Sequence, residues 1–158
     1  MAPAPAVVPA GLSIRGARDA DVPALVDLLV GGALVAGKEE PGNPRPYEDA
    51  LAEIRSSPGC EVLVAELGGS VVGMCQLIVF RHFQVLGGRC AEIESVHVHP
   101  ARRGRGIGGA LLEAAVSRAS TAGCYRAQLT SNRERGAAHR FYERHGFAAT
   151  HEGFKRVL

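Results

Sequence analysis

The chain has 158 residues, of which 46% are hydrophobic and 22% are charged, the balance of an ordinary globular protein that forms one domain. Its formal net charge of +2 is too small to indicate a general nucleic-acid binder. The four cysteines lie far apart, without the paired cysteine or histidine spacing that marks a zinc site. Cysteines used in this way are typical of a reduced, intracellular protein, so a cytoplasmic location is expected.

The amino-terminal sequence MAPAPAVVPA predicts a loose tail rather than a targeting segment. It has no charged start and is interrupted by Pro3, Pro5 and Pro9, unlike a secretory signal. No apolar run is long enough to cross a bilayer, so no membrane partner is expected. We therefore expect a flexible tail over residues 1–11 and one domain over residues 12–158.

The first half of the domain predicts one strand followed by two helices. Residues 12–18 (LSIRGAR) favour a strand, and Asp19 or Asp21 is placed to cap the helix that follows through PALVDLLV. A long connection rich in glycine and proline covers residues 31–46. Residues 47–57 carry apolar side chains at helical spacing and predict the second helix.

The second half predicts an alternation of strands and helices. In chain order the expected elements are strands 61–67, 71–83 and 90–100, helix 110–123, strand 125–131 and helix 137–147. Short turns make the first three strands antiparallel, and the helix between the last two strands predicts one right-handed parallel crossover. The tail, residues 147–158, is expected to add one or two strands. The fold class is therefore α/β, with a mixed sheet and helices on its faces.

Residues 102–109, RRGRGIGG, bring four glycines and three arginines together between a predicted strand and a predicted helix. Free backbone N–H groups and the positive dipole at a helix start attract anions, and glycine lets the backbone approach a ligand closely. Arginines at the rim neutralise phosphate charge. The stretch predicts a phosphate or pyrophosphate cradle, with a solvated basic turn as the alternative.

Gly104, Gly106 and Gly109 also spell the GxGxxG pattern of dinucleotide-binding loops. That pattern needs an acidic residue about 20 residues further on to bind ribose, and the segment there, AQLTSN, has none. The chain also offers only one strand–helix–strand unit, too little for a doubly wound domain. A dinucleotide-dependent oxidoreductase is therefore disfavoured. A Walker A loop is excluded because the chain has no GK[ST] sequence.

Three segments together resemble the GCN5-related N-acetyltransferase (GNAT) family. Residues 103–108, RGRGIG, resemble its Q/R-x-x-G-x-G/A motif, EIESVHVHP resembles its fourth strand, and RFYERHGF resembles its late helix. The resemblance covers nearly the whole chain from residue 12. It implies the GNAT fold: a mostly antiparallel central sheet flanked by about four helices, with a splayed strand pair that binds CoA.

The resemblance implies acetyl-CoA as cosubstrate and no metal. Its pyrophosphate is expected on the backbone N–H groups of the loop, and its pantetheine amides on the backbone of the preceding strand. Asn132 is a further expected cofactor contact. Many members carry an asparagine seven residues before the tyrosine of the late helix, which is Tyr142 here, and this chain has Arg135 at that position. The expected cofactor-binding residues are Val96, His97, Val98, Arg103, Gly104, Arg105, Gly106, Ile107, Gly108, Gly109 and Asn132.

Direct transfer to an amine needs a general base and is helped by a general acid. Glu92 and Glu94 share parity on one predicted strand, so both face the same side, and either is a candidate base, directly or through a water. Glu92 matches the spacing of the glutamate in histone-acetylating members and is slightly favoured. The resemblance assigns Tyr142 as the acid that meets the CoA sulfur. By parity His97 is expected on the opposite side of the sheet.

The sequence thus predicts an acetyl-CoA-dependent N-acetyltransferase that acts on a primary amine by direct attack, without an acyl-enzyme. The alternative is a catalytically silent acyl-CoA-binding sensor or regulatory module of the same fold. The acceptor stays open between a small-molecule amine and a peptide or protein amine. The acidic side chains in residues 38–49 hint at a cationic acceptor. A homodimer is an open alternative to a monomer, and no nucleic-acid partner is expected.

Overall fold

The computed structural model describes residues 7–158, so the first six residues of the expected tail lie outside the described part. Five strands form one sheet in the order β1-β2-β3-β4-β5. The strands are β1 (Leu12–Gly16), β2 (Cys60–Leu67), β3 (Ser70–Arg81), β4 (Arg89–Val98) and β5 (Cys124–Gln128). The helices are α1 (Val22–Gly32), α2 (Arg45–Ser56), α3 (Gln84–Gly87), α4 (Ile107–Thr121) and α5 (Gly136–Arg144), with 3₁₀ turns η1 (Asp19–Asp21) and η2 (Pro100–Arg102).

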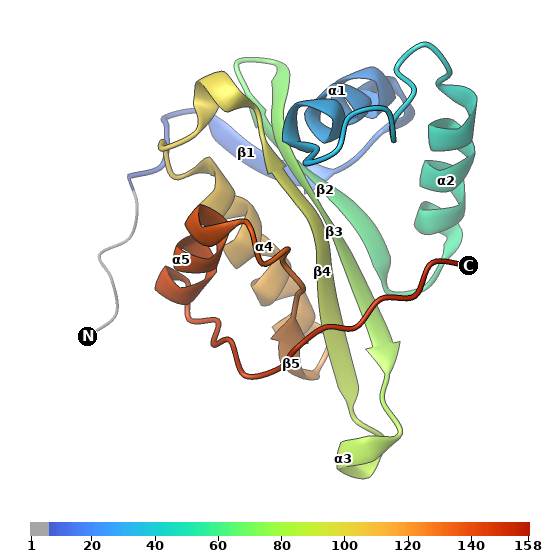
Figure 1. Cartoon of the computed structure of the whole chain (residues 1–158), viewed down its shortest axis with the longest axis vertical. Coiled ribbons are helices and arrows are strands. Elements are labelled where there is room, and N and C mark those ends of the chain that lie inside the picture. Colours follow the sequence, from blue (N-terminus) through green and yellow to red (C-terminus); the bar gives the residue numbers. More distant parts are fainter. Residues whose placement is uncertain (1–6) are drawn as a thin grey trace.

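The helices cover both faces of the sheet (Figure 1). Alternate residues of β2 and β3 belong to two different apolar clusters, one on each face of the sheet, because neighbouring side chains on a strand point to opposite faces. Leu63 and Leu77 pack with α4 on one face, whereas Val64 and Met74 pack with α1 and α2 on the other. Burial on both faces explains why these central strands are nearly continuous apolar runs.

The predicted pairing of the five strands that precede the tail is confirmed. Strands β1 to β4 pair antiparallel in sequence order, and β4 and β5 pair in parallel through the α4 crossover. The parallel ladder is short, running from Arg89 opposite Cys124 to Glu92 opposite Gln128. Beyond Glu92 the two strands part, which leaves the β5-facing edge of residues 93–98 without a strand partner in the described chain.

A β-bulge interrupts β4 where the strands have parted. Gln76 on β3 pairs with Glu94, but Met74 pairs with His97, so one residue of β3 opposes two of β4. Ser95 takes the left-handed conformation, with φ of 52°. The extra residue reverses the parity of the strand, and His97 therefore faces the same side as Glu94. The prediction that His97 faces the opposite side was wrong for this reason.

The strands predicted in the tail are not formed. Residues 147–158 contain no strand, and Phe154, Val157 and Leu158 are exposed. Because β5 ends at Gln128 and leaves β4, there is no long ladder beside it for the tail to extend. Apolar side chains that reach no sheet face add little stabilisation to set against the loss of chain entropy.

Asp21 does not cap α1 through its side chain as the sequence suggested. Its buried carboxylate accepts from the backbone N–H of Arg18 at 2.7 Å and from Arg15 Nη1 at 2.7 Å. Arg15 also donates from Nε to Glu66 at 2.9 Å, so it links β1, β2 and the start of α1. The hydrogen bond from Arg15 holds the pKa of Asp21 below its ordinary value, against the opposing effect of burial.

The lowered pKa of Asp21 makes the free energy of unfolding depend on pH in the acid range. Its contribution is present above the ordinary carboxyl pKa of about 3.9 and is lost as pH falls through the lower folded value. Asp21→Asn should lower the free energy of unfolding by on the order of 2 kcal/mol near neutral pH. The unfolding free energy of this variant should also decrease less steeply as the pH is lowered. Asp19→Asn is the control, since Asp19 pairs with Arg55 at an exposed site. Equal acid profiles for the two variants in urea titrations would contradict this role.

Candidate active site

A cavity of about 710 Å³ lies where residues 102–109 meet the ends of α1, β4 and α5, and we call it the loop cavity. All the predicted cofactor-binding residues line it except Arg105 and Asn132. Segments that are distant in the sequence therefore meet at one site, as the resemblance implied. Arg102, Arg135 and Arg144 also line the cavity and were not among the predicted contacts.

The loop has the backbone conformation of an anion cradle. Gly104 and Gly106 have φ of 72° and 73°, a left-handed conformation that side chains with a Cβ adopt only with strain. Helix α4 begins directly after Gly106, so the free N–H groups of its first turn lie at the loop. Arg103 Nε donates to the Val98 carbonyl at 3.1 Å and fixes the loop to the end of β4.

Gly108 and Gly109 have a packing role that the sequence did not predict. A Cβ at Gly108 would lie 3.3 Å from Phe141 Cζ, and a Cβ at Gly109 would lie 2.7 Å from His145 Cε1. These two positions lack a side chain because α5 packs closely against the first turn of α4. Their predicted binding of pyrophosphate through the backbone is compatible with this packing.

The unpaired edge of β4 forms another wall of the loop cavity. Val96 and Val98 line it and pack against the α4 cluster. The His97 ring lies against α1, where a Cβ at Gly32 would collide with it. Burial, aided by the charges of Arg135 and Arg103, lowers the pKa of His97, so the ring is neutral at pH 7. An extended amide-bearing chain fits this free strand edge.

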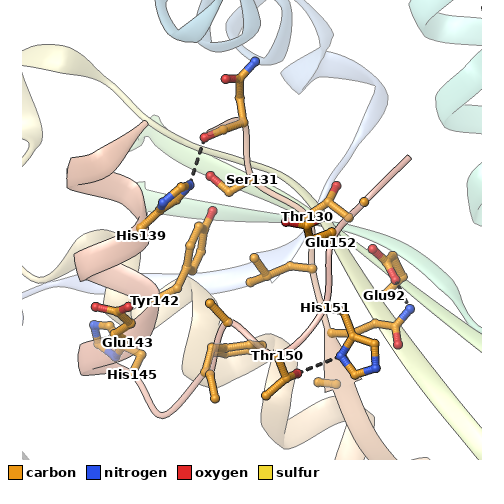
Figure 2. Close-up of a pocket in the computed structure, with 18 of the residues that line it drawn as sticks. Glu92, Thr130, Ser131, His139, Tyr142, Glu143, His145, Thr150, His151 and Glu152 are labelled. Carbon is orange, nitrogen blue, oxygen red and sulfur yellow. Dashed lines mark hydrogen bonds between the residues drawn. The ribbon is translucent and has the colours of Figure 1, made fainter. Parts of the chain in front are cut away.

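A second cavity, of about 1330 Å³, lies between the ends of β4 and β5, helix α5 and the tail, and we call it the tail cavity. Both candidate bases, Glu92 and Glu94, line it. Tyr142 lines both cavities. Figure 2 shows its ring projecting from α5 toward Ser131, with Glu92 across the same space. The three predicted catalytic side chains thus border one continuous region.

The environments of these three side chains differ. Gln128 Nε2 donates to the Glu92 carboxylate at 2.7 Å, whereas Glu94 has no hydrogen bond or ion pair within residues 7–158. Burial raises the pKa of Tyr142, the charge of Glu94 adds to this, and the charge of Arg135 opposes it. Tyr142 therefore holds its proton at neutral pH.

Asn132 lies away from the loop cavity and shapes the turn before α5. It lines the tail cavity, its Oδ1 accepts from the Glu134 backbone N–H at 2.9 Å, and its carbonyl oxygen lies 2.9 Å from His139 Nε2. The second of these contacts is drawn in Figure 2. Arg105 lies within the loop, between Gly104 and Gly106, but lines neither cavity.

The acidic side chains that suggested a cationic acceptor do not line either cavity. Tyr47 Oη donates to Glu39 at 2.9 Å and accepts from the Glu40 backbone N–H at 2.8 Å. Asp49 pairs with Arg45 at 3.2 Å. These contacts hold the connection before α2 together, and they give the acidic run a structural explanation.

Within residues 7–158, no group of three or more histidine, cysteine or acidic side chains is placed to hold a metal ion. Over the same range, none of the helices combines the length and the apolar character needed to cross a bilayer.

Parted strands beside a glycine loop at a helix start agree with the CoA-binding acyltransferase fold that the resemblance implied, and comparison with known proteins identifies the family. The model of the "Acetyltransferase (GNAT) family" matches residues 30–147. The chain therefore belongs to the GNAT family, whose members use acetyl-CoA as acetyl donor, and it is an acetyl-CoA-dependent N-acetyltransferase.

Three relatives illustrate the match. Aminoalkylphosphonate N-acetyltransferase of Salmonella typhimurium strain LT2 is 34% identical, over 71% of this chain and 72% of the relative. L-amino acid N-acyltransferase MnaT of Escherichia coli K12 is 32% identical, over 71% of this chain and 65% of the relative. A crystal structure described as a transcriptional regulator from Bacillus halodurans C-125 is 35% identical with a TM-score of 0.86, over 93% of this chain and 99% of that one.

The loop geometry predicts the effect of filling the cradle. Gly106→Glu places a side chain on a left-handed residue and a negative charge beside the helix start. Acetyl-CoA affinity should fall at least about tenfold by calorimetry, equivalent to about 1.4 kcal/mol. Gly69→Glu is the control, because Gly69 is also left-handed, with φ of 78°, and lines neither cavity. A folded Gly106→Glu protein that binds acetyl-CoA like the control would refute the cradle.

Proposed function

We propose that the protein acetylates the primary amine of a small molecule by direct attack on acetyl-CoA, with a β4 glutamate as general base and Tyr142 as general acid. The observation that carries this proposal is the position of Tyr142 at the border of the two cavities. One cavity contains the glycine loop, and the other contains Glu92 and Glu94. Donor and acceptor would approach the tyrosine from these two sides.

The residues of the loop cavity fit acetyl-CoA. The backbone N–H groups from Gly104 to Gly109 would bind the pyrophosphate, with Arg102 and Arg103 neutralising its charge. The free edge of β4 at Val96 and Val98 would pair with the pantetheine amides. When bound, acetyl-CoA supplies a thioester that is activated toward amines and releases a thiolate.

Glu94 is the better-supported base. It lies nearer the parted end of β4 than Glu92, and its carboxylate has no protein partner in the described chain. Its charge also acts on Tyr142, which puts the two groups in one electrostatic environment. Glu92 is held by Gln128, so it is better suited to orient β5. This preference reverses the slight one drawn from spacing.

Tyr142 fits the role of acid because burial raises its pKa and keeps it protonated at neutral pH, so its proton is available when the bond between the acetyl carbon and the sulfur breaks. The amine proton would pass to the glutamate carboxylate, directly or through a water, and the tyrosine proton to the sulfur. Both transfers would occur at the border of the two cavities.

The acceptor class is supported by the names of two relatives. Aminoalkylphosphonates and L-amino acids are small primary amines, and both carry an acidic group. The tail cavity, at about 1330 Å³, is large enough for such molecules. A small amine metabolite is therefore favoured over a protein lysine.

A regulatory module that binds acyl-CoA without catalysis is the second candidate. The description of the Bacillus halodurans structure as a transcriptional regulator favours it. The two functions are separated by measuring thiol release from acetyl-CoA with a panel of amines, beside acetyl-CoA binding by calorimetry. Binding without amine-dependent thiol release would support the regulatory module and refute the proposed enzyme.

Replacing the acid should slow chemistry and leave donor binding intact. Tyr142→Phe keeps the ring that packs against the core but removes the proton. We expect kcat to fall by about 10²- to 10⁴-fold, the usual range for general acid catalysis, with little change in acetyl-CoA affinity. Tyr125→Phe is the matched control, since Tyr125 is exposed and bonds His82 away from both cavities. Full kcat in Tyr142→Phe would leave the tyrosine a packing role only.

Replacing the base should change the pH profile. A carboxylate base works only when deprotonated, so it produces the limb on which kcat/KM rises with pH. Glu94→Gln should remove that limb and lower the plateau, whereas Glu92→Gln should keep it. The opposite result would assign the base to Glu92, and a limb retained in both single variants and in the double variant would exclude both.

A further inference from the structure

Arg135 connects the catalytic helix to the far end of α1. It immediately precedes α5, and its Nη2 donates to the carbonyl of Gly32, the last residue of α1, at 2.6 Å. Gly32 is 103 positions away in the sequence. The bond satisfies a carbonyl that a helix end leaves free and fixes the direction of the half-buried guanidinium at the wall of the loop cavity.

The guanidinium of Arg135 has no carboxylate within 4.0 Å in residues 7–158. Arg15, also half-buried, shows the contrast, because Asp21 and Glu66 both pair with it. A guanidinium has five N–H donors, and the only side-chain hydrogen bond of Arg135 in that part of the chain uses one. A cation held away from bulk water without a counter-ion is unfavourable, and a bound anion would relieve this.

Arg135 also acts on the groups around the reacting atoms. Both Tyr142 and His97 are influenced mainly by burial, and the charge of Arg135 lowers the pKa of each. Arg135 lies seven residues before Tyr142, about two helical turns, or roughly 10 Å of rise. Arg135 lines the loop cavity and not the tail cavity, whereas Tyr142 lines both. An acceptor held in the tail cavity would therefore reach Arg135 by extending its anionic group past Tyr142.

On the basis of the proposed acetyl transfer, we infer that Arg135 determines acceptor specificity by binding an anionic group, a carboxylate, phosphonate or phosphate, a few bonds from the acceptor amine. The planar guanidinium fork matches the paired oxygens of all three groups. Arg102 and Arg103 belong to the glycine loop and are engaged by the pyrophosphate in the proposed complex, whereas Arg135 stands on a different wall. The acidic run before α2 lines neither cavity and offers no competing site for a cationic acceptor.

The test compares acidic acceptors with neutral ones of similar length: β-alanine with its amide, and 2-aminoethylphosphonate with 3-aminopropanol. The full chain is measured as wild type, Arg135→Gln, Arg135→Lys and the control Arg140→Gln, which alters an exposed arginine of the same helix. Wild type should prefer the acidic member. Arg135→Gln should lower the acid-to-neutral ratio of kcat/KM about tenfold or more, the scale of a lost charged hydrogen bond. Arg135→Lys should give an intermediate ratio, and Arg140→Gln should leave it unchanged.

Two results would overturn the inference. One is a wild-type preference for the neutral amines. The other is an Arg135→Gln protein whose acid-to-neutral ratio of kcat/KM is unchanged. This holds even if its rates with all acceptors fall or its acetyl-CoA affinity falls, because Arg135 would then serve the donor or the contact between α1 and α5.

If no amine is acetylated, the proposed transfer fails separately. The anion site is then tested by calorimetry of 2-aminoethylphosphonate binding to the CoA complex. Binding by wild type that is lost in Arg135→Gln supports the site, and absence of binding by wild type refutes it.

Discussion

The site depends on the point at which β4 stops behaving as a regular strand. The ladder with β5 ends at Glu92, and the bulge at Ser95 follows within three residues. Parting the strands exposes a backbone edge between the glycine loop and α5, where an extended donor fits. The bulge turns the strand by one residue, so Glu94 and His97 share a face that an unbroken strand would have divided. One extra residue therefore decides which side chains meet.

The glycine stretch couples the binding loop to the catalytic helix. Gly104 and Gly106 give the loop its left-handed turns, and Gly108 and Gly109 allow α5 to pack against the same helix start. Side chains at the last two positions would require α5 to move, and such overpacking typically costs about 1–3 kcal/mol. Because Tyr142 is on α5, the residues of the proposed phosphate cradle also fix the distance between that cradle and the proposed acid. Binding and positioning are parts of one packing arrangement.

The sequence predicted the parts of the fold that local patterns control. Apolar spacing located the helices and strands, and short turns ordered β2, β3 and β4, because periodicity and turn chemistry act over a few residues.

The bulge was not predictable, since one serine in a left-handed conformation has no sequence signature. The role of Asp21 was missed because its partners on β1 and β2 come close only in the folded chain. The tail does not form the predicted strands because strand pairing needs a neighbouring strand, and β5 turns away from β4 after Gln128. The cradle could be predicted because its glycines and arginines are adjacent in sequence, whereas the contact between Arg135 and Gly32 joins residues 103 positions apart and had no local signal.

The charges around Tyr142 explain how one buried phenol can both hold and release a proton. Burial and Glu94 raise its pKa, which keeps the proton before reaction, whereas Arg135 lowers it and would stabilise the tyrosinate left after donation. With an anionic acceptor bound, the charge of Arg135 would be partly neutralised, so it would stabilise the tyrosinate less. In the proposed role, the benefit of Arg135 to an acidic acceptor therefore comes from anchoring the molecule and not from strengthening the acid. A neutral acceptor would lack this anchor, so discrimination would appear mainly in KM.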